Sequence, residues 1–508
     1  MTSYAGGRRL ESTILHALTG KRVDLTPASR DRMETSGGWL WGKPEDFDQE
    51  FALDPQQLWA FLSFTQITSD ADRKIVDLTP GSDTRQPFLG ALGWEISRRG
   101  VVDVLRRGMS YGPLHLLLFY GLSSPPPHGS MRLYRQNRFS VTPRLLYSRN
   151  EQRGPLSLCL FINGLPIITL ELADGSEMIT VEDAVDWYKH IRTVEEPLFQ
   201  RGRCVAHFAV DDRQVSVCAD LREGDSVFLP FNQGLRDDET NPPRLFGVPT
   251  EYLWRRILTR RSVADIIENY AHIVSTVDDW SGRPRLAAIF PRYHQLDVGR
   301  RLLADIDYYG VGRRYLIQHA VGSGKSQSMV WLISQLLDIE VVDMAQFGTV
   351  VVVTDRPSSD RWLPETIRHF SRLSAIVDAR VSDRSRIEEL LESPNRIIVV
   401  DVRDFPFVLD EIKVHFHGYG YAIVIDETQS SSGRDWHSNP ADSMEIDAPG
   451  ESMEDQVNRA MHQREFLPNA SYFVFTATPN DATLEIFGQP YNDRGVTRYR
   501  PFHEYGVR

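Results

Sequence analysis

Residues 315–326 read YLIQHAVGSGKS, an apolar run followed by a glycine-rich turn that ends in a lysine and a serine. The next residues, SMVWLISQLL, have the pattern of a helix. A glycine-rich turn between a strand and a helix points backbone N–H groups and the positive end of the helix dipole at a phosphate. We therefore expect a phosphate-binding loop, in which the lysine supplies a charge and the serine a magnesium ligand. Its residues are Gly322, Ser323, Gly324, Lys325 and Ser326.

The composition is that of an ordinary folded protein, with 41% apolar and 25% charged residues over 508 positions. A formal net charge of −12 excludes a polycation that coats nucleic acid by bulk charge, so any such contact must be local. Only six of the 57 basic residues are lysines, which makes Lys325 informative. His319 stands where loops of this type usually have glycine or alanine, but the flanking strand and helix favour the same interpretation.

The loop lies in a region where apolar segments alternate with helical patterns. This rhythm predicts an α/β fold with a parallel sheet and crossover helices. A stretch over 435–456 has seven acidic residues and no lysine or arginine, which predicts a solvated, mobile loop. The other expected strands are TVVVVT (349–354), RIIVVD (396–401), YAIVID (421–426) and SYFVFT (471–476).

Polar residues follow two of these expected strands. Asp426 and Glu427 end one strand, and ligands collect outside the carboxyl ends of parallel strands. We expect Asp426 to hold Mg²⁺ and Glu427 to activate the water that attacks a γ-phosphate. Thr476 and Thr478 end a neighbouring strand, where small hydroxylated residues can sense the phosphate.

The first half of the chain has a different pattern. Leu10, Ile14, Leu15 and Leu18 are spaced for one face of an amphipathic helix. Asp54-Pro55 is typical of a helix start, and a second helix is expected through 89–99. LSLCLFI (156–162) and LPIITLEL (165–172) flank Asn163-Gly164, which predicts a hairpin with a two-residue turn. Further short strands are expected at 204–210 and 215–219.

Three cysteines without CxxC spacing argue against a disulfide framework and a zinc site, and indicate a reducing compartment. The N-terminus has no secretory signal pattern, and no apolar run approaches about 20 residues. We therefore expect a cytoplasmic protein without a membrane span.

Together these motifs resemble a known family. AVGSGKS (320–326), DETQ (426–429) and TATP (476–479) resemble motifs I, II and III of superfamily 2 helicases. These motifs and IFPRYHQLD (289–297) resemble the motor, or R, subunit of type I restriction enzymes over nearly the whole chain. The resemblance implies ATP and Mg²⁺ as cofactors, adenine contact by Gln295, and a RecA-like lobe. It also implies double-stranded DNA and the methylation and specificity subunits as partners. The family usually has Asp-Glu-Ala-His where this chain has DETQ.

The resemblance further implies a restriction-endonuclease-like α/β domain in the first half. Its metal site needs an Asp on one strand and a Glu-x-Lys on the hairpin partner, because residues two apart share a face. The corresponding residues here are Ser157, Glu171 and Ala173, so only Glu171 is retained as a catalytic and metal-binding candidate. A neutral hydroxyl is a poor Mg²⁺ ligand, and we expect an inactive nuclease. Lys189 or Asp174 could supply the missing groups instead, and Glu171 could be purely structural.

The expected domains are a nuclease-like domain over 1–275, a RecA-like lobe over 276–490 and a tail over 491–508. The 29 residues after Pro479 are too few for the second lobe of such a motor, so we expect that lobe to be absent from this sequence. Two interpretations follow: an R subunit with ATP-dependent translocation and endonuclease activity by family, or a non-catalytic ATP- and DNA-binding remnant that regulates a defence complex. Candidate DNA-facing residues are Arg255, Arg256, Arg260, Arg261, Arg300, Arg301, Arg313 and Arg314.

Overall fold

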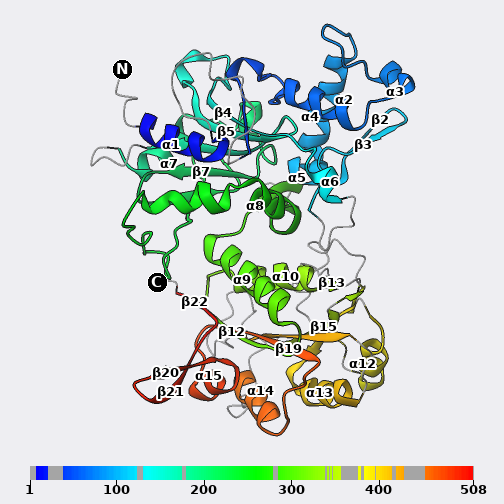
Figure 1. Ribbon diagram of the computed structural model, residues 1–508, viewed down its shortest axis with the longest axis vertical. Coiled ribbons are helices and arrows are strands. Elements are labelled where there is room, and N and C mark those ends of the chain that lie inside the picture. The colour runs from blue at the N-terminus through cyan, green and yellow to red at the C-terminus, as the bar shows by residue number, and fades with distance from the viewer. Residues whose placement is uncertain are drawn as a thin grey trace, which may run out of the picture. The chain divides into compact units, whose positions relative to one another are not determined.

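The computed structural model divides into two compact units, Met1–Tyr293 and His294–Arg508, which are described separately (Figure 1). The boundary expected at 275/276 falls inside strand β10 (His272–Val277), which pairs with β11 (Pro284–Ile289) within the first unit. The residues described are 7–20, 38–122, 130–173, 179–277, 284–337, 340–341, 344–345, 347–355, 376–378, 381, 383–394, 396–414, 419–427 and 452–506.

A mixed sheet forms the centre of the first unit. β1 pairs with β4, and β6 with β7, in parallel, whereas the other neighbours are antiparallel. Every residue of β6 is buried, so this strand lies in the core. In spatial order the described strands are β1 (Leu40–Trp41), β4 (Phe139–Leu145), β5 (Leu156–Ile162), β6 (Leu165–Leu172), β7 (Ala206–Val210), β8 (Val215–Cys218) and β9 (Leu229–Pro230).

The predicted hairpin is confirmed. Ile162 pairs with Leu165, and Asn163 and Gly164 between them have φ of +51° and +84°. Both residues of a two-residue primed turn need positive φ, which asparagine and glycine tolerate. A Cβ on Gly164 would collide with the backbone oxygen of Asp54, so glycine is required there twice over.

The helices of the first unit include those predicted. The four apolar residues of the amphipathic N-terminal helix are buried, and the Asp54 side chain accepts a hydrogen bond from Gln57 N at the start of α2. The described α-helices are α1 (Gly7–Thr19), α2 (Pro55–Thr65), α3 (Asp70–Ile75), α4 (Arg85–Arg99), α5 (Val101–Arg107), α6 (Ser130–Tyr134), α7 (Val181–His190) and α8 (Arg260–Asp265). Two π-helical segments, Leu253–Ile257 and Ile266–Tyr270, flank α8, and β2 (Met109–Tyr111) pairs with β3 (Leu114–Leu116).

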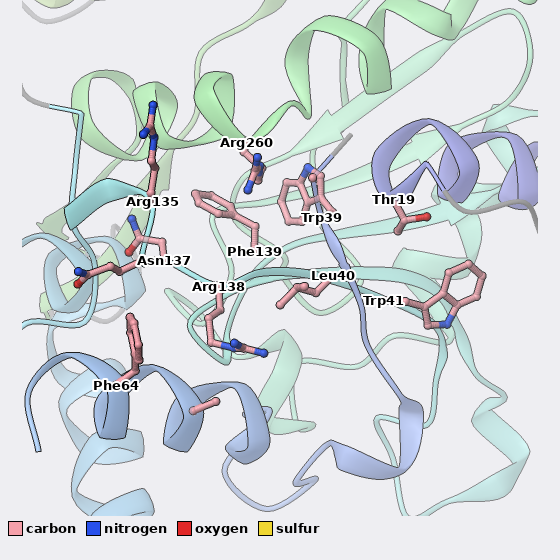
Figure 2. Close-up of a pocket in the computed structure, with 13 residues that line it drawn as sticks. Thr19, Trp39, Leu40, Trp41, Phe64, Arg135, Asn137, Arg138, Phe139 and Arg260 are labelled. Carbon is pink, nitrogen blue, oxygen red and sulfur yellow. The ribbon is translucent and has the colours of Figure 1, made fainter. Parts of the chain in front are cut away.

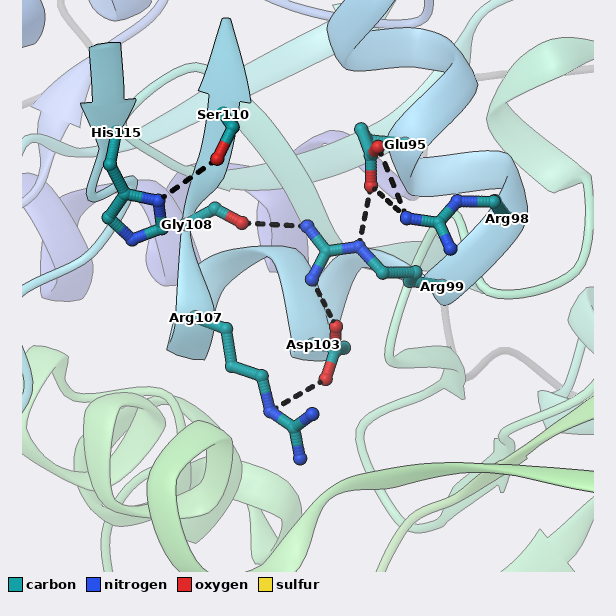
Figure 3. Close-up of polar contacts among 8 residues, drawn as sticks. All are labelled: Glu95, Arg98, Arg99, Asp103, Arg107, Gly108, Ser110 and His115. Carbon is teal, nitrogen blue, oxygen red and sulfur yellow. Dashed lines mark hydrogen bonds and ion pairs between the residues drawn. The ribbon is translucent and has the colours of Figure 1, made fainter. Parts of the chain in front are cut away.

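Ion pairs join α4 and α5 on their polar side (Figure 3). Arg99 binds both Glu95 and Asp103, Arg98 lies 2.9 Å from Glu95, and Arg107 lies 3.1 Å from Asp103. Arg99 also donates to the Gly108 carbonyl. Arg98, Arg99 and Arg107 are therefore neutralised by carboxylates within the unit.

A parallel sheet forms the second unit, as predicted. All strands of this sheet run in the same direction, with β12, which precedes the glycine-rich turn, between β19 and β22. In spatial order the described strands are β16 (Ile376–Asp378), β17 (Arg396–Asp401), β15 (Phe347–Thr354), β18 (Gly420–Asp426), β19 (Ala470–Thr476), β12 (Arg314–His319) and β22 (His503–Tyr505).

Helices cover both faces of this sheet, α9 and α10 on one face and α12 to α15 on the other (Figure 1). The described helices are α9 (Tyr293–Tyr309), α10 (Lys325–Leu336), α12 (Arg384–Leu391), α13 (Phe405–Val414), α14 (Met453–His462) and α15 (Asp481–Phe487). Short hairpins pair β13 (Glu340–Val341) with β14 (Met344–Ala345) and β20 (Gln489–Asp493) with β21 (Val496–Arg500).

Two sequence expectations differ from this unit. Most of the acidic loop expected over 435–456 lies outside the described residues, but its end is helical, because Ser452 caps α14 and Glu454 and Asp455 form its first turn. Acidic residues stabilise the positive end of a helix dipole, which explains their position. The expected tail over 491–508 instead contains β21 and β22.

The three cysteines are free and buried. Burial raises the pKa of the Cys204 thiol to about 12, which makes this thiol unreactive. Among the described helices, none combines the length and apolar composition that crossing a lipid bilayer requires.

Candidate functional site

The glycine-rich turn joins β12 to α10 as predicted. Gly322 and Gly324 have φ of +83° and +81°, a conformation that residues with a Cβ rarely adopt. A Cβ on Gly322 would meet no atom within 4 Å, so the loop backbone faces open space there. Ser323 is buried and donates to the Ala320 carbonyl, which closes the turn. The loop therefore has a fixed backbone with one open side.

Lys325 begins α10 and is partly buried beside two carboxylates. Burial lowers its pKa below the usual value, while attraction to Asp426 and Glu427 opposes this shift. Asp426 is almost fully buried at the carboxyl end of β18, where it pairs with Phe475 of β19. The structure thus brings together the loop lysine and the acidic pair that the sequence identified separately.

Glu427 follows Asp426 at the same sheet edge. Burial raises the pKa of its carboxyl above the usual value, although a hydrogen bond from Thr476 and the charge of Lys325 oppose the shift. Its Oε2 is buried and has no hydrogen-bond partner among the described residues. A carboxylate of raised pKa with one uncommitted oxygen has the chemistry of a general base. Thr428 and Gln429, which complete the DETQ segment, lie outside the described residues.

Thr476 and Thr478 complete this edge of the sheet. Thr476 is fully buried at the end of β19, opposite Gln318 of the loop strand β12. Its hydroxyl accepts a hydrogen bond from Thr478 N at 3.2 Å. The threonine segment therefore lies between the acidic pair and the strand that leads into the glycine-rich turn.

The residues at this edge fit a nucleotide with Mg²⁺. Ser326 and Asp426 offer hydroxyl and carboxylate oxygens, which Mg²⁺ prefers, and this ion is commonly held by one or two carboxylates plus phosphate oxygens. No group of three or more His, Cys, Asp or Glu side chains suited to a metal occurs in the described part of the chain. A dedicated protein cage is thus not seen there, whereas a phosphate-bridged ion suits Ser326, Asp426 and the open loop.

Gln295 lies in the first turn of α9 and contacts the loop itself. Its Nε2 donates to the Gly324 carbonyl at 3.0 Å, and a Cβ on Gly324 would collide with this amide. The neighbouring His294 donates from Nε2 to the Ser323 carbonyl at 2.9 Å. The first turn of α9 therefore stabilises the glycine-rich turn by donating hydrogen bonds to its backbone carbonyl groups.

Glu171 of the first unit lies in a different kind of environment. Its Oε1 accepts a hydrogen bond from Arg192 Nε at 2.6 Å, with both side chains almost fully buried. Its Oε2 accepts from the Ser157 hydroxyl at 2.7 Å. Arg192 also donates to the Tyr147 hydroxyl at 2.8 Å and the Pro155 carbonyl at 3.0 Å. Both oxygens of Glu171 are therefore committed within the protein.

The other residues of the expected nuclease site do not surround Glu171 with further ligands. Ala173 is fully buried in a small apolar cluster with Val181, Ala184 and Ala209. Lys189 lies near the end of α7, where its charge acts on Cys218. Asp174, the other expected substitute, lies outside the described residues.

Residues 294–500 match the family model of the SWI2/SNF2 ATPase. The chain is also 22% identical, over 367 residues, to the type I restriction enzyme HindI endonuclease subunit of Haemophilus influenzae. That match covers 70% of this chain and 33% of the relative, so the chain spans about a third of the relative's length.

Two solved structures are similar to parts of the chain. A fragment assigned to the HsdR subunit of a type I restriction enzyme from Vibrio vulnificus YJ016 has 14% identity and a TM-score of 0.26, covering 69% of this chain and 49% of that chain. The helicase domain of Pyrococcus furiosus Hef has 14% identity and a TM-score of 0.25, covering 37% and 34%.

A histidine cluster next to the glycine-rich turn was not predicted from the sequence. His319 Nε2 lies 2.8 Å from His503 Nδ1 of β22, and His503 Nε2 lies 3.4 Å from Asp297. Tyr505 stacks on His294 with ring centroids 3.5 Å apart. Burial and the neighbouring cationic groups lower the pKa of His319 well below its usual value, so this ring stays neutral. The unusual residue at 319 was the only signal of this cluster in the sequence.

Proposed function

We propose that this chain acts as the ATP-hydrolysing R subunit, or part of it, of a type I restriction–modification system. The observation that carries this proposal is the position of Lys325 between the glycine-rich turn and the carboxylates Asp426 and Glu427. The match to an ATPase family model over 294–500 and the similarity to a type I restriction subunit support it. The proposed partners are double-stranded DNA and the methylation and specificity subunits.

Each residue has a proposed role in hydrolysis. Lys325 places its ammonium group against the phosphates, and Ser326 and Asp426 hold Mg²⁺, which neutralises phosphate charge when bound. Glu427 orients the attacking water and accepts its proton, and the hydrogen bond from Thr476 fixes its carboxylate. Thr478 connects this edge to the following helix. Gln295 contacts adenine in this proposal, which requires its amide to release the Gly324 carbonyl.

The second part of the proposal is that the nuclease-like unit does not cleave DNA. Mg²⁺ needs carboxylate oxygens that are free to bind it, and both oxygens of Glu171 have protein partners. A buried guanidinium also repels a cation. In this interpretation Glu171 is structural, and cleavage by the assembled system depends on another protein.

Calorimetry with ATP–Mg²⁺ tests the first part. Lys325→Ala removes a charge-assisted contact, so we expect affinity to fall by about tenfold or more. Lys413→Ala, which removes an exposed lysine of α13, is the matched control and should bind as the wild type does. Equal affinity in wild type and Lys325→Ala would overturn the proposal.

A further inference from the structure

A cavity of about 740 Å³ lies in the first unit, far along the chain from the glycine-rich turn (Figure 2). It is bounded by β1, α2, the turn between α6 and β4, and the start of α8. Its volume is in the range of pockets that enclose a small organic ligand. Apart from Arg260, which is among the candidate DNA-facing residues, no residue at its wall belongs to the candidate sites described above.

All charged side chains that line this cavity are positive. Arg135, Arg138 and Arg260 line it, and no aspartate or glutamate does. In the part of the chain that the structure describes, none of these three arginines forms an ion pair, in contrast to Arg98, Arg99 and Arg107 in Figure 3. Among the described residues, these three guanidinium groups therefore lack the direct ion pairs that Arg98, Arg99 and Arg107 form.

Two of these guanidinium groups are positioned by their neighbours. Arg138 Nε donates a hydrogen bond to the Gln57 side chain at 2.8 Å. Burial lowers the pKa of Arg138, and attraction to Asp54 only partly opposes this shift. Arg260 lies directly against Gly38, where any Cβ would collide with its guanidinium. Gly38 has φ of +73°, a second reason for glycine at this position. The guanidinium groups of Arg138 and Arg260 are therefore held at the cavity wall, and a bound anion would stabilise their positive charge.

Aromatic rings form another part of the wall (Figure 2). Phe64 of α2 is 73% exposed. Trp39 and Phe139 are buried and meet edge to face, with centroids 5.4 Å apart, and Trp39 Nε1 donates to the Leu258 carbonyl. The wall thus combines an exposed ring, Phe64, with a buried aromatic pair, Trp39 and Phe139. Arginine binds phosphate in a bidentate manner, and flat aromatic rings stack on nucleobases.

We propose that this cavity binds a nucleoside phosphate, with its phosphate on Arg135, Arg138 and Arg260 and its base against the aromatic wall. The ligand chemistry is the same for a free nucleotide and for one unit of a single strand. The proposal does not rest on the proposed function, because all of its residues belong to the first unit, whereas the glycine-rich turn belongs to the second.

Isothermal titration calorimetry with the full chain tests the proposal, using thymidine 5′-monophosphate and an oligothymidylate of about eight residues as probes. All proteins carry Lys325→Ala, so that phosphate binding at the glycine-rich turn does not contribute. The test variant is Arg135→Gln with Arg260→Gln. The matched control is Arg132→Gln with Arg261→Gln, which removes two exposed arginines from the same two segments but outside the cavity wall.

We expect the test variant to bind at least about tenfold more weakly than the control variant, since each lost phosphate contact is charge-assisted. Phe64→Ala, at a position that is exposed to solvent, should also weaken binding. Similar affinities for the two probes assign the site to free nucleotides, and much tighter binding of the oligonucleotide assigns it to a strand. Equal affinities of the test and control variants, or no binding of either probe, would overturn the proposal.

Discussion

Arg192 Nε lies 2.6 Å from Oε1 of Glu171, and the two side chains are 4% and 2% exposed. This buried pair occupies the place where the resemblance to type I restriction subunits implies a metal-binding carboxylate. An ion pair in a protein interior is stable only when both charges are compensated, and here Ser157 and Tyr147 supply the remaining hydrogen bonds.

We predict that the protein does not nick supercoiled plasmid in the presence of Mg²⁺. The physical reason is that a cation would have to displace the Arg192 guanidinium from Glu171. Gel analysis of plasmid after incubation with wild type and Glu171→Ala checks this. Mg²⁺-dependent nicking by the wild type that disappears in Glu171→Ala would contradict it.

The same pair predicts a large effect on stability. Arg192→Met leaves the buried carboxylate of Glu171 without its partner, so the free energy of unfolding should fall by about 3–5 kcal/mol. Chemical denaturation followed by circular dichroism measures this. Arg149→Met is the control, since Arg149 pairs with Glu50 at the surface and should change stability by less than about 1 kcal/mol. Equal effects of the two substitutions would show that the Arg192–Glu171 pair is not a structural element.

We predict that the free energy of unfolding depends on pH through His207. Burial lowers its pKa to about 3, from a usual value of 6.5, and Thr169 lies 2.7 Å from its Nδ1. The unfolded chain binds a proton at this residue below pH 6.5 and the folded chain does not. Its contribution to stability is therefore lost as the pH falls from 6.5 toward 3, by about 1.4 kcal/mol per pH unit.

Denaturant unfolding of wild type and His207→Gln between pH 7 and pH 4.5 measures this contribution. The difference in unfolding free energy between the two proteins should shrink as the pH falls, because the variant lacks the titrating group. A constant difference for His207→Gln would mean that His207 is not held neutral.

We predict that substitution of His294 lowers the affinity for nucleotide, although His294 supports the glycine-rich turn and does not bind the nucleotide in this proposal. His294→Ala removes its hydrogen bond to the Ser323 carbonyl and its stacking on Tyr505, so the glycine-rich turn loses support. We expect the dissociation constant for ATP–Mg²⁺ to rise about threefold to tenfold, which corresponds to one lost hydrogen bond. His462→Ala, an exposed position on α14, is the control for calorimetry. An unchanged dissociation constant with an intact circular dichroism spectrum would show that this support is dispensable.

Local patterns predicted much of the fold. The turn at Asn163-Gly164 and the start of α2 at Asp54-Pro55 depend on the conformational preferences of a few adjacent residues. The strands of the parallel sheet are buried on both faces, so each is a continuous apolar run that can be recognised without its neighbours. The glycine-rich turn is directly preceded by strand β12 and followed by helix α10, so its structural context could be recognised from adjacent residues.

Features that depend on distant residues were not predictable in this way. β22 contains His503, Glu504 and Tyr505, which have no apolar run, and it is a strand only because β12 offers it an open edge. Arg192 follows α7 without any local sign that it is buried. The acidic residues at the start of α14 raise the local negative charge, a pattern that predicts a loop, although Ser452 caps a helix there.

β22 also determines how the glycine-rich turn is anchored. Phe502 N donates to the Leu316 carbonyl and Ala320 N donates to the Tyr505 carbonyl, each at 2.9 Å. β12 is consequently tied on both sides, and it cannot slide along its own axis without breaking bonds to two strands. A pull on the chain beyond Arg500 is transmitted through β22 to Ala320, the residue at which the turn begins. A segment that follows the turn by more than 170 residues in the chain therefore contributes to its mechanical stiffness.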